Sequence, residues 1–317
     1  MSTPQFGERA EPGPGDVCYR HKDRPSFTLC QRCGRTICPD CQQISAVGVL
    51  CPECVKAASP GVAQRTRRSS RRIAWRLSDP ETPVVSYGIM IACAVVFVAQ
   101  WLTSQFAGSV ATTALWYAPA YSLPNSVSGA YFADVSFEPW RMFTVMFTHS
   151  TGFLLHILFN MYALWLFGPG LERMLGRLWF FVLYVFAGLG GSIGVMLWVY
   201  FAPNQVAALA TPTVGASGAI FGLFAAAFVA FRVQRVNATS LLVLIGINFA
   251  IGFLPNANIS WQAHLGGMVF GALTMWALMS SRGPRRKKLR LLWVGGIAAL
   301  IVVLALAYFI VVPSVFA

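Results

Sequence analysis

Seven long apolar runs limit what this 317-residue chain can fold into more than any other feature. Each run is long enough, or nearly so, to cross the roughly 30 Å hydrocarbon core of a bilayer as a helix. Only 11% of the residues are charged, whereas soluble domains carry about 25%. The sequence therefore predicts an all-α polytopic membrane protein with spans near 84–103, 143–168, 178–201, 214–231, 239–254, 261–280 and 291–312.

The positions of the basic residues predict how these spans are oriented. If the N-terminus is cytoplasmic, the segments before the first span and after the second, fourth and sixth spans all face inward. Of the 24 Lys and Arg residues, only Arg141 then falls in an outward segment, which is the positive-inside pattern. We therefore expect a cell-membrane protein with its N-terminus inside and its C-terminus outside. The net charge of +13 then needs no nucleic-acid partner, and the basic clusters 65–76 and 282–290 are expected to contact anionic lipid headgroups.

The polar N-terminal region contains four pairs of soft metal donors, each pair separated by two residues. Tetrahedral zinc takes two such pairs, so four pairs predict two closed, structural zinc sites. A disulfide framework is the alternative, but the predicted cytoplasmic location is reducing. The pairs are Cys18 with His21, Cys30 with Cys33, Cys38 with Cys41, and Cys51 with Cys54.

Spacing alone leaves open whether neighbouring or alternating pairs share a metal. The segment resembles a B-box-type zinc finger, which implies that the first pair joins the third and the second joins the fourth. A closed site has no open position for water, so we interpret the module as an interaction or regulatory domain with a cytoplasmic protein partner. The expected domains are a disordered tail (1–15), the zinc module (16–58), a basic linker (59–80), a six-helix core (81–281), and a basic loop with a seventh helix (282–317).

The scarcity of acidic residues in the membrane part excludes several catalytic mechanisms. Residues 82–317 contain only Asp134, Glu138 and Glu172, and all three are predicted to lie in loops. An aspartate-dyad protease and a carboxylate proton relay both need acids within the spans, so neither is supported. A His-Glu-x-x-His zinc motif is also missing from the sequence. Serine–histidine chemistry remains.

Three polar residues are predicted to lie at similar depths near the outer face. Ser217 is near the start of the fourth span and His264 near the start of the sixth. His156 lies 12 residues before Gly168, the expected inner end of the second span, and hence roughly 18 Å above the inner face. We predict a dyad in which Ser217 is the nucleophile and His264 is the general base, with no acidic third member.

An oxyanion hole and a close helix contact complete this prediction. His156 and Asn160 are four residues apart, so they share a helix face and can both donate hydrogen bonds, together with the backbone N–H of Ser217. Gly267 and Gly271 lie on the face that carries His264. There they can pack against Gly218 and Gly222 of the fourth span, so helix packing and catalysis predict the same arrangement.

The motifs "GASG", "AHLGG", "HILFN", "PWRMFT" and "LERMLG" occur in regions that correspond to these spans. Over about 84–281 the chain resembles the rhomboid intramembrane serine proteases. The resemblance implies a six-helix core that cleaves transmembrane segments, to which the seventh helix is an addition. It also implies the roles given above to Ser217, His264, His156 and Asn160, and places Gly215 in the same site.

The same resemblance implies structural roles for Trp140 and Arg141, at the end of the long first loop, and for the adjacent Glu172 and Arg173. Two alternatives remain open. A catalytically silent rhomboid-like protein would bind membrane clients without cutting them. A protein centred on its zinc module would use the helices only as an anchor, which leaves the polar residues of three spans unexplained.

Overall fold

The protein forms two compact units, Met1–Arg76 and Leu77–Ala317. The expected tail, most of the expected linker with the 65–76 basic cluster, and Asp134 all lie outside the described residues. The computed structural model describes residues 16–46, 48–58, 78–132, 135–253 and 259–316.

The first unit is small and has little regular structure. Its β1 and β2 form an antiparallel hairpin in which Ile44 faces Val49. Its core consists of cysteines plus Ile37 and Leu50, which is too little apolar material to hold such a small unit without further cross-links. The elements in order are η1 (Pro39–Cys41), β1 (Gln43–Ser45), β2 (Gly48–Leu50) and α1 (Pro52–Ala58).

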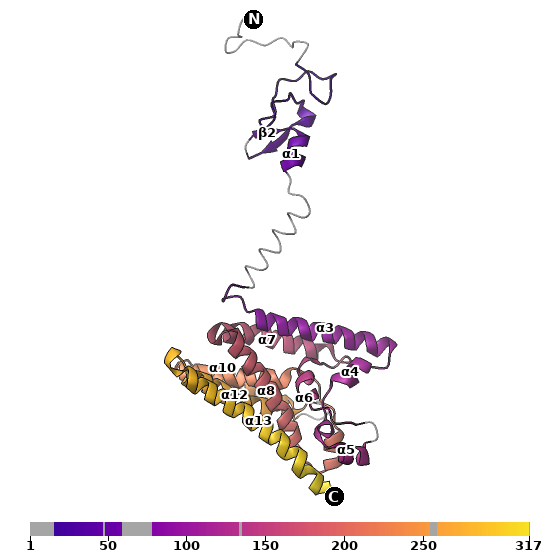
Figure 1. Cartoon of the computed structure of the whole chain (residues 1–317), viewed down its shortest axis with the longest axis vertical. Helices are drawn as coiled ribbons and strands as arrows, with labels where there is room; N and C mark the ends of the chain where they lie inside the picture. Colours follow the sequence, from indigo (N-terminus) through magenta and orange to yellow (C-terminus); the bar gives the residue numbers. More distant parts are fainter. Residues whose placement is uncertain (1–15, 47, 59–77, 133–134, 254–258, 317) are drawn as a thin grey trace. The chain divides into compact units, whose positions relative to one another are not determined.

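The second unit is a bundle of apolar helices (Figure 1). In the described part of the chain, five helices are long and apolar enough to cross a membrane, and two shorter apolar helices accompany them. The predicted polytopic all-α architecture is confirmed. The long helices are α3 (Val84–Phe106), α7 (Leu154–Leu175), α8 (Arg177–Trp198), α12 (Trp261–Ser280) and α13 (Lys287–Phe316), and the shorter ones are α10 (Ser217–Val233) and α11 (Thr239–Ile251).

The second span was placed wrongly by the sequence, which predicted 143–168. Two short elements, α6 (Arg141–Thr144) and η3 (Val145–Phe147), precede a loop, and α7 begins only at Leu154. It then continues through Pro169 to Leu175. His156 therefore lies in the first turn of α7, about 28 Å from its far end rather than 18 Å. Hydropathy cannot separate apolar residues that pack as short helices from residues that span.

Glu172 was also wrongly predicted to lie in a loop, because it belongs to the last turn of α7 and is buried. Its carboxylate accepts hydrogen bonds from the backbone N–H groups of Val85 (2.9 Å) and Ser86 (2.7 Å) and from the Ser86 hydroxyl (2.7 Å). These N–H groups are unpaired donors of the first turn of α3, whose positive dipole end favours an anion. Arg173 adds a bond from Nε to the Glu81 carbonyl (3.0 Å). The end of α7 is thus fastened to the start of α3.

The long loop between α3 and α6 is folded around the Arg141 side chain. The buried guanidinium pairs with Glu138 and donates to the carbonyl oxygens of Thr113 and Trp116. It also lies 4.0 Å from the centre of the Tyr121 ring. Trp140 beside it is exposed. The loop contains α4 (Val110–Leu115), η2 (Pro119–Ser122) and α5 (Asn125–Tyr131), and α9 (Gln205–Ala210) packs against η2.

Helices α10 and α12 meet backbone to backbone. A Cβ on Gly267 would collide with the Gly218 carbonyl, and one on Gly271 would collide with the backbone of Gly222. The expected glycine stripes therefore face each other. Without side chains between them, the two helix backbones are in direct contact at these glycines.

Helix α8 adds a third glycine surface, which the sequence analysis did not single out. A Cβ on Gly191 would lie 3.3 Å from the Cα of Gly218, and one on Gly194 would collide with the Gln262 carbonyl. The run "GLGGSIG" at 188–194 carried this signal. On the outside of the bundle, α13 runs along α12 (Figure 1).

Substituting Gly267 tests this packing. We expect Gly267→Ala to destabilise the protein by roughly 1–3 kcal/mol, because the methyl group meets a backbone carbonyl that cannot rotate away. Thermal unfolding in detergent micelles measures the effect. The matched control is Gly295→Ala in α13, where a Cβ meets nothing within 4 Å, so stability should stay equal or rise slightly. Equal melting temperatures for the two variants would contradict the close contact.

Candidate active site and metal centres

Ser217 and His264 lie together where α10 and α12 begin. Ser217 is the first residue of α10 and His264 the fourth of α12. The Ser217 Oγ is 3.0 Å from the His264 Nε2, which is hydrogen-bond distance. The glycines that bring α10 and α12 into contact lie within two turns of Ser217 and His264. The close packing of the two helices therefore also sets the distance between these two side chains.

The His264 imidazole is held by stacking instead of by a carboxylate. Its ring lies on Phe221 with a centroid distance of 3.9 Å and an interplanar angle of 12°. Its Nδ1 is buried and has no hydrogen-bond partner among the described residues. Phe221 was not singled out from the sequence, although its position four residues after Ser217 places both on one helix face.

Gly215 makes room for His156 beside the serine. Its φ of +128° is a conformation that side-chain-bearing residues rarely adopt. A Cβ at this position would lie 2.8 Å from the His156 Nε2 and 3.5 Å from the Ser217 Oγ. The His156 Nδ1 accepts a hydrogen bond from the Ser150 N–H (3.3 Å), so a neutral imidazole carries its proton on Nε2. Nε2 is thus a donor near the serine hydroxyl.

Asn160 is buried one turn further along α7. Its Nδ2 donates to the carbonyl of His156 at 2.7 Å. Among the described residues, no hydrogen bond joins Asn160 to Ser217 or His264. The structure therefore places Asn160 next to the site but gives its amide an intrahelical partner.

Gln100 of α3 fixes the loop that precedes α7, and the sequence analysis missed it. Its Oε1 accepts from the His149 N–H (3.0 Å) and its Nε2 donates to the His149 carbonyl (3.1 Å). The next residue, Ser150, supplies the bond to His156. The sequence signal was a polar amide inside an apolar run, which is costly unless it is paired. The His149 ring meets the His156 ring edge-on at 5.3 Å, and neither of its nitrogens has a partner in the described part of the chain.

In the first unit, the eight predicted ligands form two groups that could each hold a metal ion. Within each group the ligand atoms lie within 4.8 Å of one another. The structure groups the ligands in the alternating pairing that the B-box resemblance implies. All eight cysteines of the chain are free thiols, so none forms a disulfide. The groups are Cys18, His21, Cys38 and Cys41, and Cys30, Cys33, Cys51 and Cys54.

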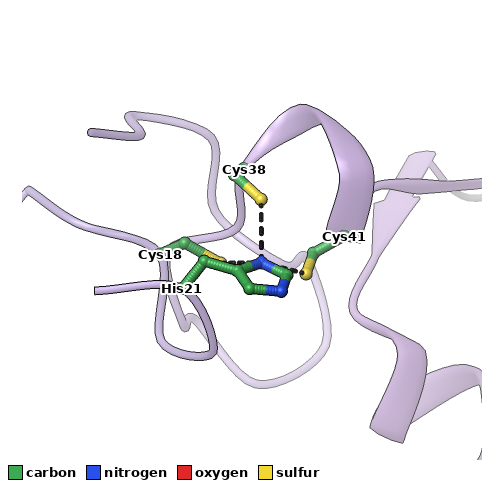
Figure 2. A group of neighbouring side chains, drawn as sticks. All are labelled: Cys18, His21, Cys38 and Cys41. Carbon is green, nitrogen blue, oxygen red and sulfur yellow. Dashed lines mark hydrogen bonds between the residues drawn. The ribbon is translucent and has the colours of Figure 1, made fainter. Parts of the chain in front are cut away.

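The first group surrounds one imidazole nitrogen (Figure 2). The sulfur atoms of Cys38 and Cys41 lie 3.3 Å and 3.4 Å from the His21 Nδ1, and that of Cys18 lies 3.9 Å away. Four soft donors that converge in this way suit a tetrahedral metal with no open position.

Thiol ionisation in the second group also fits a cation. Burial raises the pKa of Cys30, but backbone N–H groups, led by that of Cys51 at 3.2 Å, outweigh it and lower the pKa to about 6. For Cys54, a hydrogen bond with Cys51 and then burial raise the pKa to about 12. Neighbouring sulfurs thus oppose full ionisation, and a bound dication removes that opposition.

Comparisons with known proteins identify a family that this chain resembles. The Rhomboid domain profile matches residues 136–281, which include the Ser217–His264 pair and His156. The chain is 33% identical over 175 residues to "Putative rhomboid protease YdcA" of Bacillus subtilis (strain 168), covering 53% of this chain and 82% of that protein. It is 37% identical over 146 residues to "Rhomboid protease GluP" of the same organism, covering 44% of this chain and 26% of GluP.

A third relative is "Rhomboid protease AarA" of Providencia stuartii, which is 28% identical over 155 residues and matches 42% of this chain and 54% of AarA. The apolar helices make the chain a multi-pass membrane protein, and the YdcA match covers most of that relative. The chain belongs to the rhomboid family, whose members are typically intramembrane serine proteases.

Proposed function

We propose that this protein is an intramembrane serine endopeptidase that cleaves the transmembrane segments of other membrane proteins. The observation that carries the proposal is the 3.0 Å separation between the Ser217 Oγ and the His264 Nε2. A serine hydroxyl is a weak nucleophile until a base accepts its proton, and the imidazole is within reach to do so. Membership of the rhomboid family supports the same reaction class.

In the proposed reaction, the Ser217 oxygen attacks the carbonyl carbon of the scissile peptide while its proton passes to the His264 Nε2. The imidazolium then gives this proton to the leaving amine, and an acyl-enzyme forms. A water molecule, deprotonated by the same nitrogen, releases the acid product and restores the serine. Stacking on Phe221 holds the imidazole in the orientation that a third carboxylate provides in a triad.

The developing oxyanion is proposed to accept hydrogen bonds from three donors around Ser217. The His156 Nε2–H and the Ser217 backbone N–H, at the positive end of the α10 dipole, are two of them. The third is the Asn160 amide, whose second N–H is not used by its bond to the His156 carbonyl. Each such donor contributes about 3 kcal/mol to transition-state stabilisation. Gly215 leaves the space that the substrate carbonyl requires.

The proposed orientation places the zinc module in the cytoplasm and the dyad near the outer face. Helices α7, α10 and α12 carry His156, Ser217 and His264 at their N-terminal ends. The basic residues Arg173 and 282–290 are at the opposite ends of α7 and α12. Since basic segments stay inside, the N-terminal ends face outward. The two Cys/His groups then bind two structural zinc ions in a reducing compartment, where the module recruits a cytoplasmic protein.

Removing the nucleophile tests the proposed reaction. Ser217→Ala and His264→Ala should each lower kcat on a model transmembrane substrate by at least about 10³-fold, and the double variant should be no slower than either single one because the pair acts as a unit. Ser280→Ala, at the half-buried far end of α12, is the control and should cut normally. A wild-type protein that binds substrates but never cuts them would instead indicate the catalytically silent client-binding function.

Gln100 is expected to act as a positioning residue for His156. Gln100→Leu leaves the buried backbone groups of His149 unpaired, and the loop that orients the His156 ring loosens. We expect kcat to fall about tenfold, the usual effect of losing one buried hydrogen-bond partner, with little change in KM. The control is Gln105→Leu at the exposed end of α3. Parallel loss of kcat and of folded protein would show that Gln100 only stabilises the fold.

Metal analysis of paired cysteine variants tests the zinc sites and their pairing. The purified wild-type protein should contain two zinc ions per chain by mass spectrometry, and so should Cys93→Ser, whose thiol lies in α3. Cys18→Ser with Cys38→Ser should keep about one ion, because both ligands belong to one group. Cys18→Ser with Cys30→Ser should lose both, because it damages each group. The reverse result would indicate that neighbouring pairs share a metal.

A further inference from the structure

A basic pocket lies at the end of the helix bundle that is farthest from the dyad. It has a volume of about 110 Å³ and is formed where α7 and α12 end and where α8 and α13 begin. Because Ser217 and His264 are at the N-terminal ends of their helices, this pocket is a separate site. Its lining residues are Met174, Leu175, Trp179, Leu278, Arg282 and Arg290.

Among the described residues, the arginines of this pocket form no ion pair. Residues 282–290 contain six Lys and Arg residues, and no Asp or Glu follows Glu172 in the sequence. The ion pairs of the described residues all lie elsewhere and involve Arg24, Arg35 and Arg141. An anion from outside the chain would therefore offset the excess positive charge of residues 282–290.

The start of α13 also favours a bound anion. The first turn contains Lys287 and Lys288 and no acidic residue. A helix N-terminus carries a positive partial charge and its first N–H groups lack intrahelical partners, so cations there repel the dipole. A bound anion turns this repulsion into attraction.

The two pocket arginines are fixed in place but keep free donors. The Arg282 Nη2 donates to the Met174 carbonyl (3.2 Å) and the Arg290 Nη2 donates to the Ser281 carbonyl (3.0 Å). The Arg290 guanidinium lies 5.5 Å from the Trp179 ring centre, and its Nε is buried with no partner in the described part of the chain. Each guanidinium has five N–H donors whose fork geometry matches two oxygens of a phosphate group.

The other lining residues indicate which phosphate-containing ligand fits the pocket. Met174, Leu175 and Leu278 are apolar, and Trp179 is the residue type that concentrates where lipid tails meet headgroups. We propose that this pocket binds the phosphate group of an anionic glycerophospholipid, with Arg282 and Arg290 on the phosphate oxygens and the acyl chains along the apolar lining. The lipid joins the seventh helix to the protease core. This site depends on neither Ser217 nor zinc.

Lipid titration of the delipidated full-length protein tests the proposal by native mass spectrometry. Phosphatidylglycerol should bind at least about tenfold more tightly than phosphatidylcholine, which is zwitterionic. Arg282→Gln with Arg290→Gln should weaken phosphatidylglycerol binding at least about tenfold, because two charge-assisted contacts are lost. Arg285→Gln with Lys288→Gln removes the same charge outside the pocket lining and should weaken it no more than about threefold.

Because the pocket arginines also bond to helix-terminal carbonyl groups, a second pair of variants guards against misfolding. Arg282→Lys with Arg290→Lys keeps the charge but removes the forked guanidinium groups, and phosphatidylglycerol binding should weaken about threefold or more. Displacement of phosphatidylglycerol by millimolar inorganic phosphate would keep the phosphate site but assign it to a soluble ligand. Equal losses in the two Gln pairs would overturn the pocket in favour of diffuse attraction, and so would unchanged binding in the lining pair.

Discussion

The closeness of α10 and α12 is the constraint on which the membrane unit depends. Their glycines leave only backbone atoms between the two helices, and the Ser217–His264 hydrogen bond spans the gap that results. In a bilayer the lipid tails are as apolar as the side chains, so burial of apolar surface does not drive this approach. Close van der Waals packing does, and small residues permit it. Helix α8 contributes a third glycine surface and fixes the pair from the other side.

A second common feature is that buried polar side chains bind backbone groups of distant segments. Glu172 binds the start of α3, Arg141 binds the long first loop, and Gln100 binds the loop before α7. Each supplies partners to N–H or carbonyl groups that no regular element satisfies, and in an apolar environment an unpaired group is costly. These three contacts hold the irregular parts of the fold, and the Gln100 contact leads through Ser150 to the His156 ring.

The two units are stabilised by different means. The core of the first unit is mostly cysteine, so we expect its stability to depend on the ions proposed for the two Cys/His groups. The second unit is held by helix packing, and its positive charge is concentrated at one end of the helix bundle. The proposed phosphate site fits this division, because it places an anion beside the basic start of α13, the helix that lies outside the six-helix core.

The sequence alone determined the features that depend on composition and spacing. The apolar runs, the four donor pairs and the residues Ser217, His264 and His156 are all visible there, because hydropathy and short-range periodicity are local. The tertiary structure alone decided the start of α7, the helical position of Glu172, the stacking of Phe221 on His264 and the contact of Gln100 with His149. Each of these depends on which distant segment supplies the hydrogen-bond partner of a buried polar group or packs against a ring. That information resides in long-range contacts, which no window along the chain contains.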